Sequence, residues 1–476
     1  MQQVSLPGLL WALPVLPLAG ALVALILPAA DRLTLRMVAL VASALTLLVA
    51  GLAIATAWPD LAVVVGAPVA VAAFPFVPVL RLVPEAIPAL LATSMVLPIA
   101  LRAGAPRVQE ATTAYVVAVL TLQSATVFAL LLDDVFFACA AATVGAVPGF
   151  ALLALFGGPE RGTVTWRAAA SWLLVDGLAL AGLTATTSGF RTGWLPEVIV
   201  VLVFGPGLVR LAAGPHGLWA LPVLEQTPVA GAASTAAVTG PLGAVLLWRG
   251  AVALQVFNPD ALRAVLPVFA FVFAGSATVA AALVVGERDL RRIVAHWNGL
   301  LGSIAALGVL ADVVDGTSPG TALALAAVSG VAASGLLAMI EAVERRLETR
   351  KVHELAGLAS TAPVLAVLLP ALLLLLAGMP GPGTAIPLWP LLMALMGSAA
   401  PGVSGAGLWC VGAVLLGAVG ATSVAGRVVL PSTRKYTLNI RVSFWQGIRL
   451  LAPLAALGAL SLLCWPLVQL IAAVRP

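Results

Sequence analysis

Long apolar runs, separated by short charged or Pro/Gly-rich segments, recur along the whole chain. Most runs have about 20 residues, the length with which a helix crosses roughly 30 Å of hydrocarbon. Cutting the chain at the polar segments gives about fourteen spans, so the pattern predicts an all-α polytopic membrane protein with about 14 transmembrane helices. The expected spans are residues 8–29, 37–58, 84–103, 110–132, 135–157, 166–188, 194–213, 229–256, 260–285, 289–313, 319–342, 360–378, 403–426 and 447–472.

Two segments at the start of the chain need separate interpretation. Residues 60–83 alternate Val, Pro, Ala and Phe, which predicts a short hairpin or loop outside the bilayer. The first apolar run, 8–29, follows no basic segment and has no clear small-residue cleavage site. This favours a retained span over a signal peptide.

The most unusual apolar run, residues 204–249, is interrupted by polar residues and by Pro215, Pro222 and Pro228. A proline removes a backbone donor and crowds the preceding turn of a helix. Within a bilayer, such irregular backbone survives only where protein or a water-filled path surrounds it. A second Pro-rich stretch, 379–402, follows the twelfth span. We therefore expect the helix of the seventh span to be broken.

Composition and charge agree with a membrane protein. Hydrophobic residues make up 62% of the chain and charged residues 9%, and the mean hydropathy is +1.13. Most of the 24 Lys and Arg residues lie in connections that follow odd-numbered spans. The positive-inside rule then places those connections in the cytoplasm and both termini on the non-cytoplasmic side of the inner membrane. The net charge of +5 thus reflects topology, and we expect no nucleic-acid partner.

The scattered cysteines and histidines predict no metal site and no cofactor. Cys139, Cys410 and Cys464 lie apart in apolar runs, as small buried side chains do. No glycine-rich loop is followed by Lys-Ser or Lys-Thr, the pattern that binds nucleotide phosphates. We therefore expect no catalytic residue in this chain alone.

Three segments in order carry a family resemblance. Residues 215–231 read Pro-His-Gly-Leu-Trp and then Thr-Pro-Val-Ala-Gly; residues 287–296 read Glu-Arg-Asp-Leu-Arg-Arg-Ile-Val-Ala-His; and residues 346–381 contain Glu-Leu-Ala-Gly-Leu-Ala and Met-Pro-Gly. Together they resemble the antiporter-like membrane subunits of the respiratory complex I superfamily. The nearest likeness is to the M-type subunit of NADH-quinone oxidoreductase, whose relatives include Mrp antiporters.

The resemblance implies a particular organisation of the chain. The family has two inverted five-helix repeats, formed by helices four to eight and nine to thirteen, each with one broken helix, which implies breaks at the seventh and twelfth helices of this chain. On this pattern residues 1–109 form an N-terminal three-helix segment with an extramembrane hairpin, 110–256 the first antiporter-like repeat, and 257–426 the second. Residues 427–476 form a cytoplasmic basic loop and a C-terminal helix. The partners implied are the other membrane subunits of a multi-subunit complex and the lipid bilayer.

The resemblance also implies where proton-carrying side chains should stand, and here the sequence departs from the family. Counting from the motifs puts the fifth-helix Glu on Thr143, the seventh-helix Lys on Arg210 and the eighth-helix Lys on Pro241. It puts the tenth-helix His on Leu301 and the twelfth-helix Lys or Glu on Leu388. The chain has only two lysines, both in predicted cytoplasmic connections. Arginine stays protonated and cannot pass protons on.

A few polar residues remain inside the predicted spans as candidates for an ion pathway. Asp176 is either a partner for Arg210 on the next span or a neutral acid bonded to the backbone. His296 and Asn298 are candidates for a relay or for structural hydrogen bonds. Gln123 is interpreted as a helix-packing contact.

Charged residues near the ends of spans have ordinary interpretations. Glu85 and Arg249 are expected to snorkel to water. Glu341 and Glu344 are expected to pair at the interface with the arginines that follow them.

Three functions follow from these observations. The first is a membrane-arm subunit of a complex I-like assembly whose proton pathway is degenerate and whose work is mainly structural. The second is an active proton- or sodium-translocating subunit with a rewired route through Asp176, Arg210, His296 and Asn298, in complex I or in a related hydrogenase, Mrp or inorganic-carbon uptake complex. The third, a stand-alone transporter, is disfavoured by the short loops.

Overall fold

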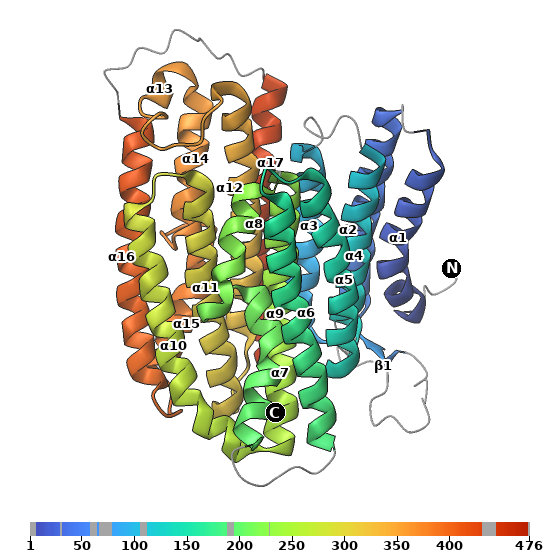
Figure 1. Cartoon of the computed structure of the whole chain (residues 1–476), viewed down its shortest axis with the longest axis vertical. Helices are drawn as coiled ribbons and strands as arrows, with labels where there is room; N and C mark the ends of the chain where they lie inside the picture. The colour runs from blue at the N-terminus through green and yellow to red at the C-terminus, as the bar shows by residue number, and fades with distance from the viewer. Residues whose placement is uncertain are drawn as a thin grey trace.

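The computed structural model describes residues 6–28, 31–57, 64–65, 79–104, 112–187, 195–227, 229–430 and 444–474. Nearly all of these residues are helical, and the long helices run side by side along the long axis of the molecule (Figure 1). The elements are α1 (Leu6–Ile26), α2 (Arg32–Ala57), β1 (Val64–Val65), β2 (Leu80–Arg81), η1 (Pro84–Ala86), α3 (Ile87–Gly104), α4 (Thr112–Leu131), α5 (Val135–Phe156), α6 (Arg161–Thr187), α7 (Leu195–Leu211), η2 (Gly214–Trp219), α8 (Ala220–Gln226), α9 (Val229–Phe257), α10 (Pro259–Gly286), α11 (Leu290–Asp315), α12 (Gly320–Leu347), α13 (Leu358–Thr361), α14 (Pro363–Leu376), α15 (Ala385–Gly397), α16 (Val403–Val429) and α17 (Phe444–Val474).

The predicted fold class, an all-α polytopic membrane protein, is confirmed. Every expected span overlaps a helix of the structure. Among the described residues, 10 helices are long and apolar enough to cross a membrane. Helices α7 and α14 are shorter, with 17 and 14 residues, because each ends at a break. The count of fourteen crossings stays a prediction.

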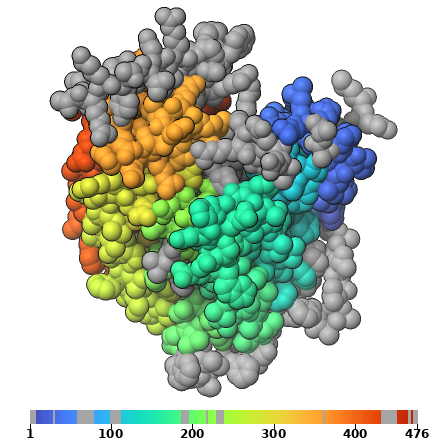
Figure 2. Space-filling model, turned by 45° about the horizontal axis from the view of Figure 1, so that its top comes forward, coloured from blue at the N-terminus to red at the C-terminus, as the bar shows by residue number. Residues whose placement is uncertain are grey.

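The outer surface of the bundle is apolar, as a lipid-facing surface must be. Large side chains such as Val144, Phe271 and Leu408 are about two-thirds exposed along α5, α10 and α16. Figure 2 shows α1 and α2, in blue, at one edge of the molecule, where many of their apolar side chains also face outward.

Helix α12 forms the centre of the bundle. Its most apolar stretch is 94% buried, and it contacts α3, α9, α11, α14, α15 and α17. Gly, Ala and Ser dominate its sequence, and such small side chains let neighbouring backbones approach closely. Small side chains therefore bring the neighbouring backbones close to α12, and buried leucines such as Leu325 and Leu337 fill the remaining space.

The first break ends α7 with a left-handed turn. The Ala213 N–H donates to Leu208 O over 3.0 Å, and the Ala212 N–H donates to Val209 O over 3.1 Å. Ala212 has a φ of 54°, a conformation in which glycine is preferred. Trp219 then donates its indole N–H to Val209 O over 2.7 Å. These bonds satisfy helix-end carbonyls that lipid cannot satisfy.

The second break, after α14, has the same construction. The Met379 N–H donates to Leu374 O over 3.1 Å, and the Gly378 N–H donates to Leu375 O over 3.5 Å. Gly378 has a φ of 76°. The indole N–H of Trp389 donates to Gly378 O over 3.0 Å. The expected breaks after the seventh and twelfth spans are thus present and share one turn geometry, whereas the tryptophan bonds a last-turn carbonyl at the first break and the turn glycine at the second.

The expected hairpin is present as the pair β1–β2, antiparallel with Val64 opposite Arg81; residues 66–78 lie outside the described residues. Its second strand is fixed to the turn between α4 and α5. Leu80 bridges Leu132, the Asp133 N–H donates to Val79 O over 2.9 Å, and Arg81 pairs with Asp133. The hairpin therefore has a defined place at one end of the bundle.

Candidate functional site

A buried ion pair joins α6 to α7. Arg210 Nη1 donates to Asp176 Oδ1 and Nη2 donates to Asp176 Oδ2, both over 2.7 Å. Asp176 is fully buried and Arg210 is only 2% exposed. Of the two interpretations left open by the sequence, the structure shows the pairing. A buried charge is tolerated when it is paired in this bidentate way.

Neighbouring groups complete the surroundings of this ion pair. Thr143 Oγ1 lies 2.9 Å from Asp176 Oδ2 and 2.8 Å from Cys139 O, so its single proton is shared between two acceptors. Arg210 Nη1 also donates to Pro206 O over 3.2 Å, and its guanidinium carbon lies 4.9 Å from the centre of the Trp172 ring. The charge of Arg210 is therefore balanced within α5, α6 and α7.

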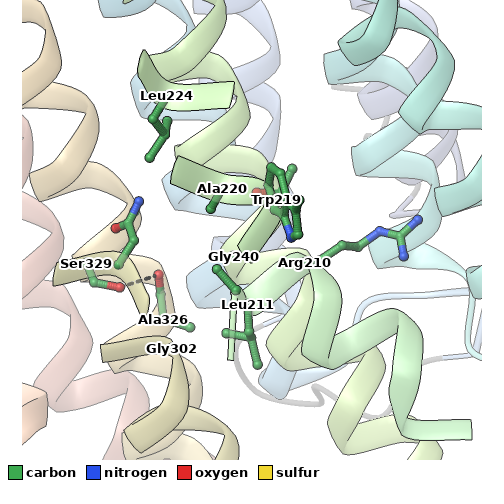
Figure 3. A pocket seen from close by; sticks show the side chains of 13 residues that line it. Arg210, Leu211, Trp219, Ala220, Leu224, Gly240, Gly302, Ala326 and Ser329 are labelled. Atoms are coloured by element: carbon green, nitrogen blue, oxygen red, sulfur yellow. Dashed lines mark hydrogen bonds between the residues drawn. The ribbon is translucent and has the colours of Figure 1, made fainter. Parts of the chain in front are cut away.

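A small cavity lies beside the first break. The volume open to the centres of water molecules is about 30 Å³, and one water needs about 10–15 Å³ of such volume. It is lined by Arg210, Leu211, Ala212, Trp219, Ala220, Leu224, Thr239, Gly240, Asn298, Gly302, Ala326, Ser329 and Gly330. Figure 3 shows the Arg210 side chain extending away from Ser329 and Gly302. Arg210 therefore contributes its stem to the cavity wall and its charge to Asp176.

Close glycine contacts position the helices around this cavity. A Cβ at Gly207 of α7 would lie 2.8 Å from Gly243 O of α9, and a Cβ at Gly302 of α11 would lie 2.0 Å from Leu211 O. Gly214 at the break donates its N–H to the hydroxyl of Ser303 over 3.1 Å. Helices α9 and α11 thus touch the end of α7 backbone to backbone.

The four ion-pathway candidates fall into two places. Asp176 and Arg210 form the ion pair, and Asn298 lines the cavity together with Arg210. His296 is not part of the cavity wall, and its Nε2 lies 3.8 Å from a carboxylate oxygen of Glu287. The structure therefore pairs Asp176 with Arg210, places Asn298 on a cavity wall that it shares with the stem of Arg210, and separates His296. Their role in ion movement stays a prediction.

Other residue types occupy the positions at which the resemblance implied proton-carrying side chains. Thr143 contacts Asp176, and Pro241 is buried inside α9. Leu301 and Leu388 are fully buried. At the second break, Leu388 lies against Gly378, where an added Cβ would meet its side chain at 2.6 Å. A leucine thus occupies the place at which the resemblance implied a charged group.

The prolines of the first break have different surroundings. Pro215 is exposed in η2, and Pro222 is half-buried in α8. Pro228 lies outside the described residues. The break itself follows from Pro215 and from the turn at Ala212.

Beyond α8 lies a group of charged residues whose contacts, apart from the pairing of Glu341 with Arg345, were not predicted from the sequence. We call it the charge cluster, and its members are Glu225, Asp289, Arg291, Arg292, Glu341, Glu344, Arg345 and Arg350. Arg292 binds both carboxylate oxygens of Glu225 over 3.0 and 3.1 Å, and Arg350 donates to Asp289 over 2.5 Å. The cluster joins α8, the start of α11 and the end of α12.

Arg291 is the centre of this charge cluster. Its Nη1 donates to Glu225 O over 3.2 Å and to Thr227 O over 2.9 Å, at the end of α8. Its Nη2 donates to Glu344 over 2.6 Å and lies 3.8 Å from Glu341. The expected pairing of Glu341 with Arg345 is present over 3.1 Å, but Glu344 pairs with Arg291 across helices.

The surroundings of Arg249 contradict the prediction that its side chain reaches water. Its side chain is only 5% exposed, so the interpretation as a snorkelling residue is wrong. Nη1 donates to Ala129 O over 3.0 Å and Nη2 to Leu130 O over 2.7 Å, at the end of α4. Glu85 is buried as well, at 7% exposure. The expected packing contact of Gln123 is confirmed, since it accepts from Ser43 over 2.9 Å.

Sequence comparisons give two matches. The profile of the family described as "NADH:quinone oxidoreductase/Mrp antiporter, TM" matches residues 168–414, a little more than half of the 476 residues. NADH-quinone oxidoreductase subunit 13 of Thermus thermophilus is 28% identical over 167 residues, which cover 35% of this chain and 34% of that protein. The chain thus matches about a third of the length of this curated relative.

Solved structures with a similar fold come from two assemblies. A chain of respiratory complex I from Thermus thermophilus with bound NADH superposes with a TM-score of 0.79 at 17% identity, covering 97% of this chain and 99% of that chain. A chain of the Mrp complex from Dietzia sp. DQ12-45-1b gives 0.79 at 18% identity, covering 99% and 98%. At these identities the likeness concerns the fold.

Proposed function

The chain belongs to the NADH:quinone oxidoreductase/Mrp antiporter transmembrane family, and on this premise we propose that it is an antiporter-like subunit in the membrane arm of a multi-subunit complex I- or Mrp-type assembly. The similar folds of chains from complex I and from an Mrp complex support this. Its partners are then other membrane subunits, in the inner membrane.

The work of this subunit is mainly structural, because its proton pathway is degenerate. One observation carries this: both carboxylate oxygens of Asp176 are bound by Arg210, a group that stays protonated. Lys351 is exposed in a loop, and no helix of the structure contains a lysine. Leu388 supports the same conclusion at the second break.

The competing function, a rewired ion route, has one observation in its favour. Arg210 and Asn298 line one cavity large enough for about two waters. His296 would have to continue such a route, but it lies against Glu287 outside the cavity wall. The structural role is therefore the better supported of the two.

The two-repeat organisation belongs to the same proposal. The breaks after α7 and α14 share a left-handed turn, at Ala212 and Gly378. Each also has a tryptophan indole bonded to a backbone carbonyl, that of Val209 in the last turn of α7 and that of the turn residue Gly378 after α14. Such a pair of breaks in corresponding positions is typical of internally repeated transporter folds. It supports residues 110–256 and 257–426 as two related halves. The proposal also places both chain termini on the non-cytoplasmic side, which rests on the distribution of Lys and Arg alone.

Ion transport by the purified complex, reconstituted in liposomes, tests this function. Asp176→Asn and Arg210→Gln are expected to lower assembly or thermal stability and to leave ion movement per assembled complex unchanged. Asn298→Leu fills the cavity wall and leaves the ion pair in place, so it is expected to change neither. Loss of ion movement in any of these variants with assembly intact contradicts the structural role.

Purification in mild detergent gives an independent check. A subunit of a membrane arm brings its neighbours with it, and redox subunits among them would identify the host complex. Recovery of a clean monomer that transports a solute by itself would contradict the proposal.

A further inference from the structure

Three exposed basic residues lie at one end of the outer helices α10 and α16. Arg288 comes two residues after α10, Arg427 lies in the last turn of α16, and Lys351 lies in the loop after α12. We call these three residues the basic corner. Helices α10 and α16 pack together along one edge of the bundle (Figure 1), so the basic corner lies beside its outer apolar surface.

Contacts between three segments of the chain bring the basic corner together. Lys351 forms a β-bridge with the residue that directly follows Arg288. Leu290, two residues after Arg288, lines a small apolar cavity together with Val428. Val428 directly follows Arg427 on α16. The three cations therefore share one place in the fold, although they come from distant parts of the sequence.

The acidic residues beside the basic corner mostly have other partners. One carboxylate oxygen of Glu287 accepts from the next two backbone N–H groups over 2.7 and 3.1 Å. Asp289 accepts from Arg350 over 2.5 Å. Glu348 is exposed three residues before Lys351, and the chain from residue 427 to its end contains no acid. Three exposed cations against one exposed acid leave the corner with a net positive charge.

An apolar outer surface continues from the basic corner toward the centre of the membrane. Val285 of α10 and Leu415 and Val419 of α16 are exposed there. A Cβ at Gly420 would lie 3.1 Å from Val285 Cα, so the two helices touch and present one continuous surface. From Leu415 to Arg427 α16 rises about 18 Å, close to half of the roughly 30 Å of hydrocarbon in a bilayer. The surface thus has the height of one lipid leaflet.

We propose that the basic corner binds the headgroup of an anionic phospholipid, whose acyl chains lie on the apolar surface of α10 and α16. All three cations lie in connections that the charge distribution predicts to be cytoplasmic, where the leaflet carries anionic lipids. Basic sites between membrane-spanning helices on that side attract such headgroups. A soluble phosphate offers the same anion, and an acidic protein segment offers a carboxylate, but neither covers Val285 and Val419. The apolar surface therefore favours the lipid.

This inference goes beyond the proposed function. It concerns a lipid partner on the outside of the bundle, and it holds whether or not the assembly moves ions. Its test counts bound lipid only, so a failure here leaves the structural role of the subunit standing. The liposome experiment above decides that role separately.

The test uses the purified complex, incubated in neutral detergent with equal amounts of dioleoyl phosphatidylglycerol and dioleoyl phosphatidylcholine. Native mass spectrometry then counts the lipids that stay bound after washing. Each cation is expected to contribute roughly fivefold to the preference for the anionic lipid. Each single change among Arg288→Gln, Lys351→Gln and Arg427→Gln should therefore lower the preference about fivefold, and the triple variant about 100-fold.

Two controls keep the folded complex comparable. Arg288→Lys/Arg427→Lys keeps both charges and is expected to keep most of the preference. Arg32→Gln/Arg161→Gln/Arg167→Gln removes the same charge from exposed arginines of α2 and α6, and it is expected to behave as the wild type. A wild-type preference in the triple variant of the basic corner, or an equal loss in this second control, overturns the proposal.

Two further arms separate the lipid from other occupants. Higher ionic strength is expected to weaken the preference, because salt screens exposed charges. Inorganic phosphate at matched ionic strength is expected to leave the lipid bound, and displacement of the lipid would assign the basic corner to a soluble anion. Loss of a neighbouring subunit from the triple variant, with its lipid count unchanged, would assign the corner to a protein contact. Either of these last two results overturns the proposal.

Discussion

Replacing Arg291 by alanine removes the centre of the charge cluster. The change leaves Glu344 and Glu341, which are 9% and 1% exposed, without their shared arginine. It also removes one donor from each of the carbonyls of Glu225 and Thr227 at the end of α8, of which Glu225 O keeps Arg350 at 3.4 Å. Helix α8 has only 7 residues, and its end is otherwise held by the contacts of Glu225 with Arg292 and Arg350 and by the Gly158 N–H, which donates to Gln226 O.

The expected loss of stability depends on the partners that Glu341 and Glu344 keep. Removing one partner of a buried ion pair costs about 3–5 kcal/mol. Glu341 keeps Arg345 at 3.1 Å, and Glu344 keeps Arg350 at 3.9 Å, so the acids are not left alone. We therefore expect Arg291→Ala to lower the free energy of unfolding by about 3 kcal/mol, at the lower end of that range. Arg291→Lys keeps the charge but loses the fork of donors, so it should give an intermediate loss.

The assay is reversible denaturant titration of the purified protein in mixed micelles, followed by tryptophan fluorescence. The matched control is Arg288→Ala, three residues earlier, where the side chain is exposed and only weak effects are expected. If Arg291→Ala unfolds at the same denaturant concentration as Arg288→Ala, Arg291 contributes nothing to holding α8, and the reasoning is refuted.

Three further predictions use the same assay. Gly302→Ala is expected to destabilise the protein strongly because its Cβ would lie 2.0 Å from Leu211 O. Gly299→Ala should be tolerated, since its Cβ would lie 3.7 Å from the nearest backbone atom. Equal effects of the two variants would contradict the backbone contact. Ala212→Gly is expected to stabilise by up to about 1 kcal/mol, since alanine at a φ of 54° is strained, and no gain would show that the turn relaxes. Arg249→Leu is expected to cost roughly 2 kcal/mol because two buried carbonyls lose their donors; wild-type stability would contradict the capping of α4.

The fold could be predicted from the sequence because the bilayer imposes it. Lipid supplies no hydrogen bonds, so every apolar run of sufficient length must become a helix. The same reasoning located the breaks, since Pro215 has no N–H with which to continue α7. Spacing along one helix also predicted the contact of Glu341 with Arg345, four residues apart.

Contacts between distant helices could not be predicted in the same way. Arg291 and Glu344 are 53 residues apart, and no local pattern joins them. Arg249 was misread because a position near a helix end predicts access to water only if no other helix covers it. Asp176 was recognised as needing a partner because a lone buried acid is costly, but its contact with Thr143 depends on how α5 and α6 lie together.

The capping of α4 by Arg249 has a consequence for membrane insertion. The arginine follows the carbonyls that it satisfies by 120 and 119 residues. At a synthesis rate of roughly 5–20 residues per second, α4 waits about 6 to 24 seconds for this donor. During that time its last turn must remain at the water interface, where headgroups and solvent can bond its carbonyls. The early helices are therefore assembled provisionally, and α9 completes them when it leaves the translocon.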